Sequence, residues 1–239
     1  MRIESHIPLE RQFSPVPKSQ EDAESDEILP IWGHVKPKTW HDLNCEFRCV
    51  ILAEAGVGKT EELRQHASVL ASLGKPAFFI RIEDIEADFY KAFEIGDEAQ
   101  FQTWLQSTKE AWFFLDSVDE ARLENPRGFE KALRCFVRDI KEGAHRAHIY
   151  LSSRPYAWRP REDRRLLDEI LFLAATQKGE GCEDGQQSEA QGTLTIYTMR
   201  PLDKERIRRF CVAREAKNID QLLHEIERAN LWSLGERPF

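Results

Sequence analysis

A glycine-containing loop between an apolar and an amphipathic segment is the first feature of the sequence that could do chemistry. Residues 50–52 are apolar, residues 53–60 read AEAGVGKT, and an amphipathic segment begins at Lys59. Phosphates are bound by backbone N–H groups that converge on their oxygens, and glycines at 56 and 58 let the backbone come close. The pattern predicts a phosphate-binding loop in which Lys59 contacts the β and γ phosphates and the Thr60 hydroxyl is a ligand of Mg²⁺.

The expected cofactors are ATP or ADP together with Mg²⁺. The residues expected to bind them are Ala53, Glu54, Ala55, Gly56, Val57, Gly58, Lys59 and Thr60. The strict motif has Gly where this chain has Ala53, so the first position of the loop is not expected to be left-handed. The alternative interpretation is an ordinary Gly-rich turn in front of a helix.

A second chemical motif is the apolar segment that ends in Asp116, followed by Ser117, Val118, Asp119 and Glu120. A carboxylate at the end of a buried strand emerges at the edge of the sheet that carries the phosphate loop, so Asp116 is predicted to bind Mg²⁺. Asp119 and Glu120 are candidates to orient or deprotonate the attacking water. Alternatively, both acids only cap the helix that follows.

The next apolar segment ends in LSSRP, which places Arg154 at the same edge. If this strand lies between the phosphate-loop strand and the Asp116 strand, Arg154 is a candidate sensor of the γ-phosphate. The alternative is an ion pair with Asp116, Asp119 or Glu120, which would also place Arg154 at the site.

Five apolar segments alternate with amphipathic segments along the chain. The apolar segments cover residues 49–52, 77–82, 112–115, 149–152 and 194–199, and the amphipathic ones cover residues 59–73, 99–107, 129–140 and 166–174. Such alternation is typical of a parallel sheet with helices on both faces. We therefore expect an α/β fold of the P-loop NTPase type, with a parallel five-stranded sheet of order 5-1-4-3-2 flanked by helices.

Three parts of the chain differ in pattern. Residues 1–30 contain Pro15, Pro17 and an acidic run, and are predicted to form a flexible N-terminal segment. Residues 31–200 carry the alternating pattern of the NTPase domain, interrupted by a polar Gly-rich segment at 176–192 that we expect to be an exposed loop. Residues 201–239 show helical patterns only, at 203–210 and 219–232, which indicates the beginning of a helical lid. Two helices would leave apolar surface uncovered, so we expect a truncated lid and a longer parent protein.

Composition limits the partners. The net charge of -8 argues against a general nucleic-acid coat, and the arginines at 159, 161, 164 and 165 are expected to form a solvated helix start opposite Glu162 and Asp163. No apolar run is long enough to span a bilayer, and the charged N-terminus lacks a secretion signal. The five cysteines are scattered without a CxxC pair, so zinc is not expected. We expect a cytoplasmic protein with no membrane or nucleic-acid partner.

Together, the segments AEAGVGKT, FFLDSVDEA and LSSRP resemble the NACHT-type NTPases of the signal-transducing ATPase (STAND) class. The most specific element is the small Ser117 after the magnesium aspartate, followed by an acidic pair. The resemblance covers residues 32–199 and, more loosely, TMRPLDKERIRRF as the start of the helical domain. Pro238 stands about where such proteins carry a proline that touches the nucleotide base.

The resemblance implies a regulatory switch that is closed with ADP and self-associates with ATP, in signalling or in defence against phage. The chain departs from the family pattern because it shows no recognisable effector before residue 31 and no sensor repeats, so its effector and sensor partners are unidentified. The expected function is an ATP-binding and slowly hydrolysing switch module. One alternative is a nucleotide-binding scaffold without turnover. Another is a P-loop kinase that uses residues 159–165 as an Arg-rich lid.

Overall fold

The computed structural model describes residues 7, 9–16, 36–124, 127–176 and 194–229. Most of the polar segment expected at 176–192, and Pro238, lie outside the described residues. In the described part of the chain, no helix is both long enough and apolar enough to cross a membrane.

Seven strands form one mixed sheet in the order β1-β7-β2-β6-β5-β3-β4. The strands are β1 (Phe13–Pro15), β2 (Arg48–Leu52), β3 (Ala77–Arg81), β4 (Phe93–Ile95), β5 (Ala111–Asp116), β6 (Ala147–Ser153) and β7 (Leu194–Met199). The five strands expected from the sequence are β2, β3, β5, β6 and β7, and all pairs among them are parallel. The expected total of five strands is wrong, and so is the order for the whole sheet, because β1 and β4 add an antiparallel strand at each edge.

Strand β1 lies within the segment expected to be flexible. It pairs with β7, and Phe13 is fully buried against the sheet and bridges to Lys38. The expectation of a flexible segment over residues 1–30 is therefore wrong for this part. A three-residue strand is too short to show an alternating pattern, and Pro15 argues against a strand unless the strand lies at an edge, as it does here.

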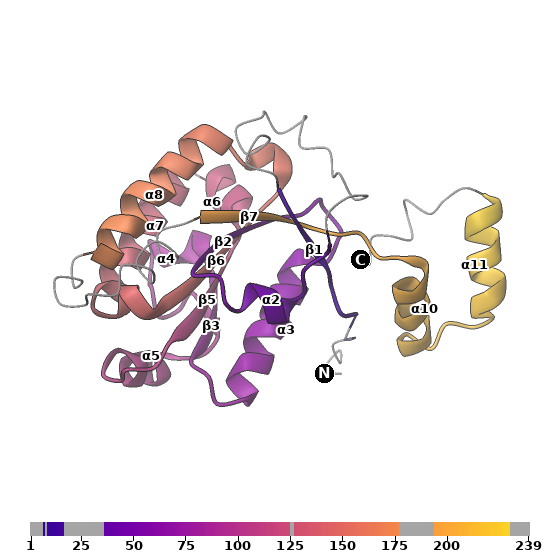
Figure 1. Ribbon diagram of the computed structural model, residues 1–239, viewed down its shortest axis with the longest axis horizontal. Helices are drawn as coiled ribbons and strands as arrows, with labels where there is room; N and C mark the ends of the chain where they lie inside the picture. The colour runs from indigo at the N-terminus through magenta and orange to yellow at the C-terminus, as the bar shows by residue number, and fades with distance from the viewer. Residues whose placement is uncertain (1–6, 8, 17–35, 125–126, 177–193, 230–239) are drawn as a thin grey trace.

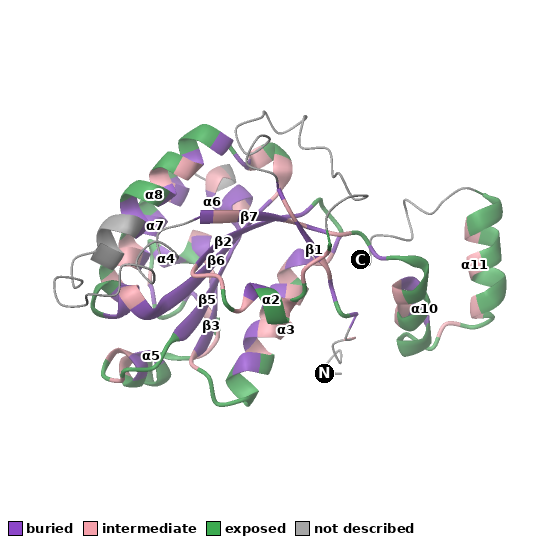
Figure 2. Ribbon diagram, in the orientation of Figure 1, coloured by how far each residue is buried: buried purple, intermediate pink, exposed green. Residues whose placement is uncertain are grey.

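Helices cover both faces of the sheet (Figure 1). They are α2 (Trp40–Leu43), α3 (Lys59–Ser72), α4 (Ile82–Ile85), α5 (Glu98–Leu105), α6 (Val118–Glu124), α7 (Gly128–Ile140) and α8 (Pro160–Thr176), with short 3-10 turns at Lys141–Arg146 and Pro155–Ala157. The helices α2 and α3 contribute to one apolar cluster, and α4 to α8 contribute to the other. The strands between them are almost entirely buried (Figure 2).

Alternation along each central strand supplies both clusters. In β2, Val50 and Leu52 pack with the α7 side, whereas Cys49 and Ile51 pack with the α3 side. Successive side chains of a strand point to opposite faces, so a strand that is apolar throughout must be covered on both. This double covering fixes the register of β2, and with it the position at which the predicted phosphate loop leaves the sheet.

The last two helices, α10 (Lys204–Ala213) and α11 (Ile219–Arg228), lie beside the sheet rather than on it (Figure 1). Both overlap the helices expected at 203–210 and 219–232. Helix α10 packs on the N-terminal segment, where Leu9 joins Leu202, Ile207 and Cys211 in a small apolar cluster. The N-terminal segment thus connects α10 to the sheet.

Two glycines with left-handed backbone offer a matched test of the core packing around Phe78. Gly96 has φ +85° and a Cβ built there would lie 2.4 Å from the Phe78 ring, whereas Gly74 has φ +74° with nothing within 4 Å. We expect Gly74→Ala to destabilise the fold by only about 1 kcal/mol, the usual cost of a left-handed L-residue. Gly96→Ala should cost about 1–3 kcal/mol more, because the core must also be overpacked. Urea unfolding of both variants measures the difference, and equal losses would contradict the predicted clash.

Candidate functional site

The predicted phosphate loop, residues 53–60, joins the end of β2 to the start of α3. Gly56 and Gly58 have φ of 77° and 85°, and Gly58 is the N-cap of α3, so both positions need the left-handed conformation that glycine adopts without strain. Ala53 is not among the residues with positive φ, and its N–H donates to the Ser153 carbonyl at 3.1 Å. The alanine is tolerated because this position still continues the strand pairing.

The loop presents its middle to solvent. Glu54, Ala55 and Gly56 are exposed, whereas Val57 is buried beneath them. The first turn of α3 begins with Lys59, so its unpaired N–H groups and positive dipole end face the same side as the exposed loop. This is the geometry in which a helix N-terminus binds an anion.

Strand β6 lies between β2 and β5, as the interpretation of Arg154 required. The side chain of Lys59 reaches across it to the end of β5. Its Nζ lies 3.3 Å from Asp119 Oδ1 and 3.8 Å from Asp116 Oδ1. The structure therefore brings the loop lysine and both aspartates together.

Asp119 is fully engaged by cations. Besides Lys59, it forms an ion pair with Arg154, whose Nε lies 2.9 Å from Oδ2, and its Oδ1 accepts the Arg154 backbone N–H at 3.2 Å; the Asp119 side chain is only 2% exposed. The ion pair considered for Arg154 is thus present, and the proposed contact with a γ-phosphate stays a prediction. Asp119 holds Lys59 and Arg154 at the loop, and a carboxylate bound in this way is a poor candidate for deprotonating water.

Glu120 lies one residue further in the first turn of α6 and differs in its surroundings. Its side chain is 38% exposed, and its Oε2 lies 3.6 Å from Arg81 Nη1. Of the two acids, Glu120 is therefore the one that solvent can reach. The structure favours Glu120 over Asp119 as the residue that handles water.

Asp116 has one carboxylate oxygen without a hydrogen-bond partner. The side chain is completely buried, and Oδ1 accepts the Ser152 hydroxyl, but Oδ2 and the neighbouring Ser117 hydroxyl have no partner. A buried polar atom left unpaired costs about 1–3 kcal/mol, so such atoms in native structures are usually satisfied by a water or an ion, or have a catalytic role. The unpaired oxygen fits a cation ligand at the place where the sequence predicts Mg²⁺.

A magnesium site here would not need a cluster of acids. Among the described residues, no group of three or more His, Cys, Asp or Glu side chains could hold a metal ion. Mg²⁺ usually takes one or two protein oxygens and completes its shell with phosphate oxygens and waters. Thr60 and Asp116 would be sufficient protein ligands on that basis.

Two arginines near the loop were missed by the sequence analysis. Arg81 ends β3 directly opposite Asp116 in the register of the sheet. Arg11 donates from Nη2 to the Val57 carbonyl at 2.9 Å, is 2% exposed, and has Nε and Nη1 buried without a partner. Burial lowers the pKa of Arg11 to about 10. Nothing regular in the sequence marks Arg11, because Glu10 beside it has φ 49° and interrupts the extended backbone before β1.

Comparison with known proteins gives no information on the role of these residues. No protein-family model and no curated protein matches the chain. The likeness to NACHT-type NTPases therefore stays a prediction that rests on the motifs, and the function must be argued from the site.

The arginine-rich segment at residues 159–165 is the start of α8. Arg159 lies 3.2 Å from Glu162, and Asp163 is paired with Arg122. Arg161 and Arg165 are exposed. The expected solvated helix start is present for Arg161, Glu162 and Arg165, but the expectation is wrong for Asp163, which is buried and bound to Arg122. These local pairs give no support to an Arg-rich kinase lid.

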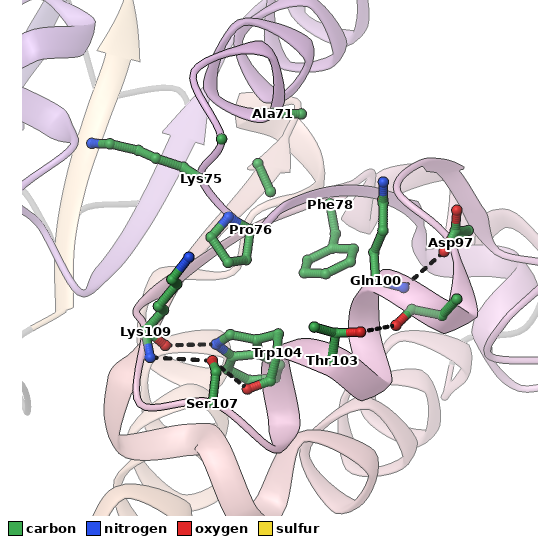
Figure 3. A pocket seen from close by; sticks show the side chains of 13 residues that line it. Ala71, Lys75, Pro76, Phe78, Asp97, Gln100, Thr103, Trp104, Ser107 and Lys109 are labelled. Carbon is green, nitrogen blue, oxygen red and sulfur yellow. Dashed lines mark hydrogen bonds between the residues drawn. The ribbon is translucent and has the colours of Figure 1, made fainter.

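A pocket of about 430 Å³ lies at the opposite edge of the sheet, where β3 begins (Figure 3). Phe78, Pro76 and Trp104 supply its apolar wall, and Lys75 and Lys109 lie at its rim. It contains none of the predicted site residues, and we assign no role to it.

Proposed function

We propose that the chain binds ATP or ADP with Mg²⁺ at the carboxyl edge of its sheet and hydrolyses ATP slowly, as the nucleotide switch module of a NACHT-type signalling or defence protein. The observation that carries the proposal is the meeting of Lys59 with Asp116 and Asp119 across β6, at the N-terminus of α3. Each member comes from a different element, and a structural ion pair alone would not require the exposed glycine loop beside it.

The cations of the site have partners that a phosphate chain can replace. Lys59 and Arg154 are both bound to Asp119. When phosphates occupy the loop, Lys59 turns to the β and γ phosphates, and Arg154 turns to the γ-phosphate. Mg²⁺ held by Thr60 and Asp116 would neutralise charge on the phosphate oxygens. Phosphate binding would therefore break both ion pairs of Asp119. Because binding and this rearrangement occur together, the nucleotide can shift the site between two states, as a switch requires.

Glu120 supplies the proton acceptor. Its carboxylate is half-exposed at the start of α6, beside the end of β5 that carries Asp116. In this position it orients the attacking water and accepts its proton. Arg81 draws the same carboxylate toward β3, so Glu120 is restrained as long as that contact persists, and slow turnover follows.

Thermal unfolding with ligands tests the proposal. A ligand at 100 times its dissociation constant stabilises the folded state by about 2.7 kcal/mol, which for a chain of this size raises Tm by roughly 5–10 °C. We expect such a shift with millimolar ATP or ADP in the presence of Mg²⁺, and a smaller one with pyrophosphate or without Mg²⁺. ATP and GTP should differ little, because only α10 and α11 are available in the described chain to enclose the base.

The outcomes separate the alternatives. No shift with any of the ligands would contradict nucleotide binding by this chain. A shift with ATP and Mg²⁺, but no release of inorganic phosphate over hours, would favour the scaffold without turnover.

A further inference from the structure

One arginine at the predicted site contacts four carboxylates. Arg81 Nε lies 3.2 Å from Glu83 and 3.3 Å from Glu94, while its Nη1 lies 3.6 Å from Glu120 and 3.8 Å from Asp116 Oδ2. The first two contacts hold the guanidinium from the side of α4 and β4. The other two bring it to the two acids to which the proposed function gives a metal ion and a water.

The contact with Asp116 falls on its unpaired oxygen. Lys59 lies near Oδ1, which also accepts the Ser152 hydroxyl, and Arg81 faces Oδ2, which has no hydrogen-bond partner. At 3.8 Å the Arg81 contact is electrostatic and lies beyond hydrogen-bond range, so it compensates the charge of this oxygen without satisfying it. A divalent cation on Oδ2 would therefore have to compete with the positive charge of Arg81.

Each carboxylate of the predicted site has a cation beside it. Asp116, Asp119 and Glu120 are within 4 Å of Lys59, Arg81 or Arg154, and Arg81 is shared with Glu83 and Glu94. A free divalent cation at Asp116 would therefore approach a carboxylate that already has two cations near it. Phosphates change this arrangement, because they take up Lys59 and Arg154 and bring negative charge of their own.

We propose that Arg81 is a positioning residue that keeps a divalent cation off Asp116 and Glu120 until a phosphate chain is bound. This role of Arg81 rests on the proposed function, in which Asp116 is the carboxylate that binds the metal. Arg81 acts as an internal counterion: it occupies the charge position of the metal in the nucleotide-free protein and holds Glu120 toward β3. The metal then enters with the phosphates, so the loop is not loaded with metal alone.

The test measures Mn²⁺ binding to the nucleotide-free chain by the electron paramagnetic resonance of free Mn²⁺. At pH 8, above the pKa of about 7 to which burial raises Glu83, wild-type protein should bind Mn²⁺ weakly. Arg81→Met should bind it at least about tenfold more tightly, because the buried Asp116 carboxylate loses the positive charge that faces its Oδ2. Adding Asp116→Asn to this variant should abolish the gain.

Arg64→Met is the matched control. Arg64 also pairs with Glu94, at 2.6 Å, but its second ion pair is with Glu61 and not with Asp116 or Glu120. It removes the same charge and shares one partner, so it should leave Mn²⁺ affinity within about twofold of wild type. Circular dichroism confirms folding, and Arg81→Gln, which keeps a polar group for Glu83 and Glu94, should give the same gain if the Met variant does not fold.

Equal Mn²⁺ affinity in the Arg81 variants and in Arg64→Met would overturn the inference, as would a gain that persists without the Asp116 carboxylate. Because the assay contains no nucleotide, its failure is distinct from a failure of nucleotide binding. If ATP stabilises the wild-type protein but the Arg81 variants gain no Mn²⁺ affinity, only the role of Arg81 is contradicted.

Discussion

Lys59→Ala should weaken the binding of both ATP and ADP by at least about 100-fold, because two charge-assisted hydrogen bonds to phosphate, each worth about 1.5 kcal/mol, are lost. Lys59 begins α3 and its ammonium already lies among the acids at the end of β5. No other side chain of the phosphate loop carries a positive charge. Isothermal titration calorimetry with and without Mg²⁺ measures the loss.

The control for this substitution is Lys75→Ala, at the opposite edge of the sheet. Lys75 is exposed and lies over the Trp112 ring, far from the loop. It should leave both affinities within about twofold, and both variants should keep the far-ultraviolet circular dichroism of the wild type. Unchanged nucleotide affinity in a folded Lys59→Ala protein would show that residues 53–60 are not the phosphate-binding loop.

Glu120→Gln and Asp116→Ala should fail in different ways. Glu120→Gln keeps the size of the side chain and removes only the proton acceptor, so ATP affinity should stay within about twofold while turnover falls by about 10²–10⁴-fold. Asp116→Ala should weaken Mg²⁺-dependent binding by about tenfold or more, and should also lower Tm, because it leaves the buried Ser152 hydroxyl without its acceptor.

Phosphate release and calorimetry on the same preparations separate binding from chemistry. Glu130→Gln, on α7 and paired with Arg134, is the same chemical change away from the site and should alter neither quantity. If Glu120→Gln and Asp116→Ala lost binding and turnover equally, the assignment of metal to one acid and water to the other would be wrong.

The central strands could be predicted because each is a continuous apolar run, and an apolar run with helical segments on both sides is buried on both faces. The edge strands β1 and β4 could not. Each has only three residues, and β4 follows β3 so closely that it lay within an expected connection. Their position depends on the antiparallel partners that they find in the sheet, which no local pattern records.

The acids and the loop lysine were predictable for a related reason. Parallel strands end at one edge of the sheet, so Asp116 and Arg154 had to come near the loop once the strand order was correct around them. Arg81 also ends a strand, but its importance comes from four acids contributed by β5, α4, α6 and β4. Arg11 is buried although arginine is mostly exposed, and its contact with Val57 joins residues 46 positions apart.

Within the described residues, the sheet ends on both sides in a three-residue antiparallel strand, and Pro15 stands in one of them. Exposed strand edges are the usual sites where another polypeptide adds by backbone pairing, and short edges with proline resist such addition. The self-association expected with ATP must therefore be built from helices and loops. The strength of self-association would then depend on how well side chains on the two copies fit together. Nucleotide can alter that fit by moving helices and loops, whereas it cannot alter backbone pairing between strands.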